Sequence, residues 1–365
     1  MGFLAFSTRR RRSLVLAAGI WVAAGFGTAR AQEYYERYDL APQPGVVNLL
    51  VQPMAYPLAF ISSTMQRDRL LRAELQRLGL RLQVFSYRKG NDIVRSATPD
   101  GFGMAFLGDM PTVNLSARLP LSIVGLGKRN FSSIVSRDFA RLDELRGRKV
   151  GYSPGSSSHL VLMRGLKAAR MTDQDVQLVT LEPADMPDAL ERGDVAAFSA
   201  WEPTPSIALA RNPKNRAIYK GMSTDWVVMP RGWTQSQAGA ALALTASYVR
   251  SINWMRQSRA HVLAGARWVL ADGQGFTGVP SKLALDKVVE IAYKDLLDVP
   301  GAPSIPSMVD GMPPLAREFA FLKAQGSIGA TIDERTLREA FGYTGLKSVQ
   351  ADAKTFQLFR FDYDQ

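Results

Sequence analysis

The densest group of hydrogen-bond donors in the sequence is a serine-rich turn, Gly155-Ser156-Ser157-Ser158-His159. The turn follows a short apolar segment and precedes leucines with helical spacing, which predicts a strand, a turn and a helix capped by its second or third serine. A helix N-terminus presents N–H groups without intrahelical partners at the positive end of the helix dipole. Such a turn can bind sulfonate, nitrate, phosphate or carboxylate, or it can simply cap the helix, and both interpretations remain open.

A second candidate for ligand contact is the segment Trp201-Glu202-Pro203, which directly follows the apolar run Val195–Ala200. The run predicts a buried strand, and ligands of open α/β sheets sit at the carboxyl ends of the strands. Trp201 is therefore placed to form an apolar wall of a site. The alternative is that Trp201 only covers the core beneath the loop.

The residue inventory argues against catalysis and against metal binding. Serines beside His159 suggest a hydrolase, but neighbours on one helical turn point in different directions, and the sequence lacks a Gly-x-Ser-x-Gly elbow. The chain has no cysteine, which excludes disulfides, thiol catalysis and lipid attachment through cysteine. The two histidines, His159 and His261, lie far apart in the sequence, and no Asp-rich calcium loop occurs. We therefore expect no catalytic residues, no cofactor and no metal.

Apolar strands alternate with amphipathic helices along much of the chain. This pattern predicts a mostly parallel sheet with helices on its faces. The expected strands are residues 46–51, 80–87, 103–107, 121–126, 149–152, 176–181 and 195–200, with helices over 62–78, after the serine turn, and from Pro183-Ala184-Asp185 to Gly193.

The first 31 residues have the features of a secretory signal peptide. Arg9–Arg12 form a basic block, Leu14–Phe26 is apolar, and Thr28–Ala31 resembles a signal-peptidase site. We therefore expect export to the periplasm, by the Sec route or, because of the arginine pair, by the twin-arginine route. The alternative, an N-terminal membrane anchor, is disfavoured because the apolar run is short.

The remaining chain is basic and large enough for two lobes. Removal of residues 1–31 would leave 334 residues and lower the net charge from +12 to +7, because five arginines are lost. The positive charges are scattered among carboxylates, which is typical of a solvated surface and permits attraction of a small anion. Nucleic acid is not an expected partner of such an exported protein. A chain of this length exceeds what one core usually organises.

Four motifs together resemble the aliphatic sulfonate-binding proteins of ABC transporters. That group belongs to the broader nitrate/sulfonate/taurine-type family, which includes carriers of thiamine-precursor pyrimidines. The resemblance extends to about Leu285 and is strongest from Gly147 to Pro203, although Glu202 stands where the sulfonate-binding proteins commonly have Asp. The motifs are Gly155–His159, Pro183–Asp185, Trp201–Pro203 and Leu107-Gly108-Asp109-Met110-Pro111.

The resemblance implies an α/β fold of the type II periplasmic binding class, with two lobes, a hinge and a ligand cleft between them. It places residues 32–128 and 230–365 in lobe 1 and residues 129–229 in lobe 2, with hinge crossings near Lys128–Asn130 and Val228–Pro230. Asp109 has an alternative role as the cap of its own helix. The implied ligand contacts are Gln52, Gly108, Asp109, Ser156, Ser157, Ser158, His159, Trp201 and Glu202.

The function implied by this resemblance is that of a monomeric periplasmic solute-binding protein of an ABC importer. It would capture a small anionic ligand, first of all an alkanesulfonate, by lobe closure and deliver it to an ABC permease in the inner membrane. Nitrate, taurine and a thiamine-precursor pyrimidine are alternative ligands, and a sensor is an alternative partner. An enzyme of the pyrimidine-synthase type is disfavoured because an exported chain would be in the wrong compartment.

Overall fold

An eight-stranded mixed sheet connects the whole molecule. In this computed structural model, which describes residues 1–2, 33–297 and 303–364, the strand order is β2-β1-β3-β8-β4-β7-β5-β6. The predicted signal peptide, residues 1–31, lies almost entirely outside the described residues. One end of the sheet carries the N-terminal strands and the other end carries strands from the middle of the chain, so each end belongs to a different lobe.

The short strands form where apolar runs predict them. On one side, β1 pairs in parallel with β2 and β3, and on the other side β5 pairs in parallel with β6 and β7. Each of these strands coincides within a few residues with a predicted one. Their bounds are β1 (Val46–Val51), β2 (Arg81–Ser86), β3 (Met104–Gly108), β5 (Lys149–Tyr152), β6 (Gln177–Thr180) and β7 (Ala197–Ala200).

Two long antiparallel strands, β4 (Leu121–Ser136) and β8 (Arg216–Pro230), join the two sides of the sheet. The predicted strand 121–126 is too short, because polar residues from Lys128 onward interrupt the apolar pattern while the backbone continues extended. The expectation of a mostly parallel sheet is also only partly correct. The pairings of β8 with β3 and β4, and of β4 with β7, are antiparallel.

The predicted helix over residues 62–78 is two helices, α1 (Leu58–Gln66) and α2 (Arg69–Arg77). Asp68 separates them, because its carboxylate accepts hydrogen bonds from the N–H groups of Leu70 and Leu71, at 3.0 and 3.2 Å, and caps α2. The same carboxylate is fully buried against Arg250 of α9. Asp68 is therefore both the N-cap of α2 and one partner of a buried ion pair.

The remaining helices cover the sheet, and α6 ends at Gly193 (φ +76°) as predicted. Among the described residues, no helix combines the length and apolar character needed to cross a bilayer. The bounds are α3 (Gly90–Ser96), α4 (Asp109–Ser116), α5 (Ser157–Ala168), α6 (Met186–Arg192), α7 (Thr204–Arg211), α8 (Arg231–Ser236), α9 (Ala238–Gln257), α10 (Arg259–Thr277), α11 (Leu285–Ala292), α12 (Ala316–Ala324), α13 (Arg335–Ala340) and α14 (Tyr343–Ala351), with a π-helix at Tyr293–Leu297.

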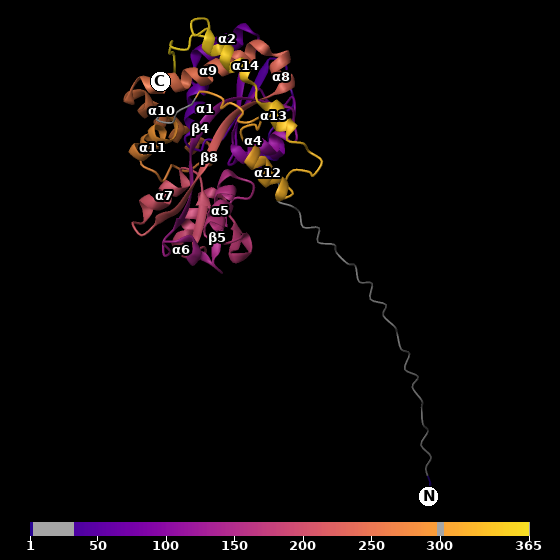
Figure 1. Cartoon of the computed structure of the whole chain (residues 1–365), viewed down its shortest axis with the longest axis vertical. Helices are drawn as coiled ribbons and strands as arrows, with labels where there is room; N and C mark the ends of the chain where they lie inside the picture. Colours follow the sequence, from indigo (N-terminus) through magenta and orange to yellow (C-terminus); the bar gives the residue numbers. More distant parts are fainter. Residues whose placement is uncertain (3–32, 298–302, 365) are drawn as a thin grey trace.

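The hydrophobic cores fall into two groups, which define two lobes. Two cores of the second lobe are built from residues between Ile134 and Tyr219. The other two cores are built almost wholly from residues before and after that stretch, with Leu160 and Ile207 as the side chains that reach over to them. Figure 1 shows the first lobe above, the second lobe with α5, α6 and α7 below, and β4 and β8 running between them. The expected architecture of two α/β lobes is confirmed.

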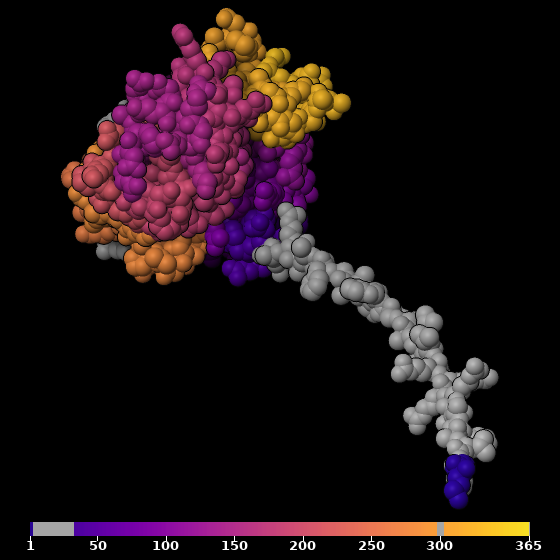
Figure 2. Space-filling model, turned by 90° about the horizontal axis from the view of Figure 1, so that it is seen from below, coloured from indigo at the N-terminus to yellow at the C-terminus, as the bar shows by residue number. Residues whose placement is uncertain are grey.

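The two lobes touch one another away from the connecting strands. Arg164 of α5 forms an ion pair with Glu318 of α12 at 3.0 Å. In Figure 2 the magenta second lobe borders directly on the yellow C-terminal segment that contains α12. The Asn91 amide also donates to the Pro154 carbonyl at 2.6 Å. These contacts hold the lobes together around the space between them.

Candidate ligand-binding site

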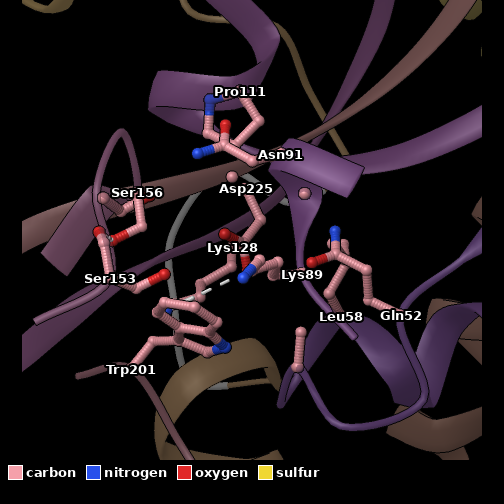
Figure 3. A pocket seen from close by; sticks show the side chains of 14 residues that line it. Gln52, Leu58, Lys89, Asn91, Pro111, Lys128, Ser153, Ser156, Trp201 and Asp225 are labelled. Atoms are coloured by element: carbon pink, nitrogen blue, oxygen red, sulfur yellow. Dashed lines mark hydrogen bonds and ion pairs between the residues drawn. The ribbon is translucent and has the colours of Figure 1, made fainter. Parts of the chain in front are cut away.

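A cavity lies between the lobes, at the point where β4 and β8 cross from one to the other. About 440 Å³ of space lies among its lining atoms, part of it open to solvent. Figure 3 shows second-lobe side chains on one side and first-lobe side chains on the other, with Lys128 and Asp225 between them. The labelled second-lobe residues are Ser153, Ser156 and Trp201; those of the first lobe are Gln52, Leu58, Lys89, Asn91 and Pro111.

The serine-rich turn begins α5 at the edge of this cavity. Ser156, rather than the predicted Ser157 or Ser158, is the N-cap, because its Oγ accepts from the His159 N–H at 3.2 Å. The Ser156 hydroxyl also donates to the Ser153 carbonyl at 2.7 Å. With Ser156 used as the cap, Ser157 lines the cavity at the first position of the helix. The positive end of the α5 dipole therefore faces the space between the lobes.

The structure brings five of the nine expected contact residues together around the cavity: Gln52, Gly108, Ser156, Ser157 and Trp201. Gln52 follows β1, and its amide is held by donation to the Phe106 carbonyl at 2.6 Å. A Cβ at Gly108 would lie 2.7 Å from the Ser157 Oγ, so glycine permits the close approach of the two lobes. The role of these residues in ligand contact stays a prediction.

Asp109 does not line the cavity but supports the backbone behind it. One carboxylate oxygen accepts from the Met110 N–H at 2.7 Å, and the other accepts from the Thr224 N–H of β8 at 3.1 Å. Burial raises the pKa of Asp109 to about 6, and the nearby Glu318 acts in the same direction. These contacts fit the alternative interpretation, in which Asp109 stabilises the start of its own helix.

Three further expected contacts, Ser158, His159 and Glu202, also lie outside the cavity lining. The Ser158 hydroxyl lies 2.9 Å from the Ser156 hydroxyl within the turn. The His159 ring packs against Tyr152 and Phe321, and burial lowers its pKa. The Ser158 and His159 side chains therefore stabilise the turn and the residues around it.

Glu202 has a structural position at the start of α7. Its carboxylate accepts from the Ser206 N–H at 3.2 Å, and its carbonyl accepts from the Tyr56 N–H of the first lobe at 3.0 Å. The backbone of this residue therefore joins the lobes while its side chain stabilises a helix end.

Three charged residues line the cavity without having been expected there: Lys89 and Asp225, and Lys128, which the sequence placed only at a hinge crossing. Lys89 forms an ion pair with Glu182 of the second lobe. Lys128 is 1% exposed, and its Nζ lies 3.9 Å from an Asp225 carboxylate oxygen. The sequence carried one signal for this pair, which was Lys128 after the apolar start of β4. A buried strand rarely contains a lysine without a partner, so this residue predicts a nearby carboxylate or ligand.

The serine and histidine side chains do not form a catalytic pair. The His159 Nδ1 accepts from the Gly155 N–H at 3.3 Å, and in the described part of the chain no serine hydroxyl bonds to the ring. Within residues 33–297 and 303–364, no three His, Asp or Glu side chains converge as metal ligands. The geometry supports ligand binding through hydrogen bonds and charge.

Comparisons with known proteins agree with the motifs. Residues 98–269 match the model of the NMT1-like family. A putative aliphatic sulfonates-binding protein of Escherichia coli is 42% identical over 66 residues, which are 18% of this chain and 21% of that protein. One of Bacillus subtilis is 22% identical over 153 residues, which are 40% and 46% of the two chains. The chain therefore matches less than half the length of either relative.

Solved structures share the fold over a larger part of the chain. The periplasmic aliphatic sulphonate binding protein SsuA of Escherichia coli superimposes with a TM-score of 0.61 and 18% identity, covering 80% of this chain and 97% of that one. The desulfurization enzyme DSZB has the same fold, with a TM-score of 0.57 and 16% identity over 85% and 99% of the chains. The fold is thus common to binding proteins and to at least one enzyme.

Proposed function

This chain has the fold of the periplasmic binding proteins and resembles their sulfonate-binding members, and from that premise we propose that it is the solute-binding component of an ABC importer. Its ligand is a small organic anion, with an aliphatic sulfonate as the first candidate. Its location is the periplasm, it acts as a monomer, and its partner is a permease in the inner membrane.

The observation that carries this proposal is a cavity bounded by both lobes and facing a helix N-terminus. The start of α5 offers N–H groups at the positive end of a dipole, the Ser157 hydroxyl there is shared between the cavity and the buried Asp109 carboxylate, and Lys128 adds a buried positive charge. Neutral donors and a lysine can hold the oxygens of a sulfonate, while Trp201 and Leu58 supply apolar surface for its carbon chain.

Lobe closure is the mechanism in this proposal. The proposed lobes are residues 32–128 with 230–365 for lobe 1 and residues 129–229 for lobe 2, except that residues 226–229, whose side chains belong to the first-lobe cores, are assigned to lobe 1. The ladder supports a return crossing at Ser223–Asp225, because these residues pair with Asn130–Lys128. A ligand that touches both lobes favours the closed form by its differential affinity, together with contacts such as Lys89 to Glu182. The closed form is then what the permease recognises.

Nitrate, taurine and a thiamine-precursor pyrimidine remain the alternative ligands. A nitrate ion would use the donors at α5 but would leave Trp201 and Leu58 without an apolar partner. We propose a binding role rather than a catalytic one, because the His159 ring and the Ser156 hydroxyl are held by structural hydrogen bonds.

A thermal-shift panel tests the proposal. The panel contains short alkanesulfonates, an aromatic sulfonate, taurine, nitrate and an aminopyrimidine, with sodium chloride at equal ionic strength as the control. A ligand at about 100 times its Kd stabilises the folded state by about 2.7 kcal/mol, so a true ligand raises the melting temperature in a dose-dependent way. We expect a rise with at least one sulfonate. The assignment of an organic anion as the ligand would be contradicted if only the pyrimidine raised the melting temperature, or if none of the anions did.

A further inference from the structure

Helix α12 lies against the second lobe, although it belongs to the first. Its residues Phe319 and Leu322 are part of the same buried core as Met110 of α4. The helix begins at Ala316, well beyond residue 269, where the match to the NMT1-like family model ends. Figure 2 shows the yellow segment that contains this helix against the magenta second lobe. The contact between α12 and the second lobe therefore lies outside the motifs that mark the cleft.

An ion pair connects α12 to α5 of the second lobe. The Arg164 guanidinium donates to the Glu318 carboxylate at 3.0 Å. The two side chains are 33% and 13% exposed. Water and salt screen such a partly buried pair less than a pair on the open surface. Separation of the lobes would pull these two charges apart.

Apolar contacts lie on the same face of α5. Leu160 precedes Arg164 by four residues, which is about one helical turn, so both side chains point the same way. Leu160 is 5% exposed, and it belongs to the first-lobe core that includes Phe319 of α12. The His159 ring also meets the Phe321 ring of α12 edge-on, with centroids 5.5 Å apart. Separation of the lobes would expose Leu160 to water, which the hydrophobic effect opposes.

The helix held in this way is the one whose start faces the cavity. Ser156 and Ser157 line the cavity at the N-terminus of α5. Leu160, Arg164 and Glu318 do not line it, so a ligand in the cavity is not needed for their contacts. Side chains of this chain alone therefore connect the ligand-facing helix to the opposite lobe.

We propose that α12 is a clamp that keeps the two lobes closed in the absence of ligand. The inference rests on the proposed lobe closure and concerns its regulation. A ligand enters only when α5 leaves α12, and the clamp contacts are the same in the empty and the occupied protein. The clamp therefore slows ligand entry and release together, and it does not select the ligand.

Spin-label distances across the contact test the clamp. The chain has no cysteine, so Ala168→Cys on α5 and Ala324→Cys on α12 place one label on each side at exposed positions. Any bound ligand is removed by dialysis in urea and refolding, and double electron–electron resonance then gives the distribution of distances. Without further changes, we expect the short distance of the closed form in about 90% or more of the molecules.

Charge reversal at the ion pair gives the decisive comparison. Arg164→Glu places two carboxylates together, so the ratio of closed to open molecules should fall at least tenfold. Adding Glu318→Arg restores opposite charges and should return this ratio to within threefold of its original value. The matched control is Lys214→Glu, a reversal at an exposed position of the second lobe, which should leave the ratio unchanged.

The outcomes separate the clamp from the function on which it rests. The clamp is overturned if the open form dominates before any charge reversal, if Arg164→Glu leaves the distances unchanged, or if Glu318→Arg does not restore them. If Arg164→Glu does not fold, as judged by circular dichroism, Glu318→Gln decides, and it should lower the ratio at least threefold. The measurement contains no ligand. Failure of every anion in the thermal-shift panel would therefore contradict the proposed function and leave this result standing.

Discussion

Replacing Ser157 with alanine tests whether the serine-rich turn binds the ligand. Ser157 lines the cavity at the first position of α5, while the neighbouring Ser158 is buried within the turn. A hydrogen bond to a charged group contributes about 1.5–3 kcal/mol, which corresponds to a roughly 10- to 150-fold change in Kd. We therefore expect Ser157→Ala to weaken anion binding at least tenfold.

The matched control for this experiment is Ser158→Ala. The Ser158 hydroxyl contacts the Ser156 hydroxyl at 2.9 Å and does not line the cavity, so its removal should change the Kd less than threefold. Both variants are titrated by calorimetry with the tightest ligand of the thermal-shift panel, and their folding is compared by circular dichroism. Wild-type affinity in a folded Ser157→Ala protein, or equal losses in both variants, would refute the role given to the turn.

Three further predictions concern residues outside the cavity. His159→Gln should change the calorimetric Kd less than threefold, because the ring packs on Tyr152 and Phe321; a tenfold loss would return His159 to the site. Asp68→Asn should lower the free energy of unfolding in urea by about 3–5 kcal/mol, because it leaves the buried Arg250 without its carboxylate; a loss below about 1 kcal/mol would contradict this. Burial raises the pKa of Asp295 to about 6, so the folded protein loses stability as pH rises from about 4 through 6 and this carboxyl ionises. Asp295→Asn should therefore raise the melting temperature more at pH 7 than at pH 4. An equal rise at both pH values would contradict the raised pKa of Asp295.

The sequence predicted well the elements whose signals are local. The run Val46–Val51 is a strand with the same bounds as expected, and the serine turn does precede a helix. Gly193 ends α6 because its positive φ suits glycine. In each case, neighbouring residues alone determine the backbone conformation.

The misjudged elements depend on partners distant in the sequence. The second half of β4 is polar, and it stays extended because β8 and β7 pair with it on its two sides. The break between α1 and α2 depends on Asp68, whose partner Arg250 belongs to α9. Neither partnership is visible in the local pattern of apolar residues.

The candidate site was predictable only in part for the same reason. The turn and Trp201 carry motifs that mark them in the sequence, and both line the cavity. Lys128 and Asp225 belong to no motif, and only the register of β4 against β8 brings them together. His159 belongs to the motif but turns away from the cavity, because its ring completes an aromatic contact between the lobes.

The central claim, that the cleft captures a small organic anion, is tested most directly by native mass spectrometry of the freshly purified protein. We predict a complex with one noncovalently bound small molecule per chain, which fragmentation identifies as carrying an acidic group. The bound fraction should fall in Ser157→Ala and stay unchanged in Ser158→Ala. A bound molecule without an acidic group, or one retained equally in both variants, would contradict the account.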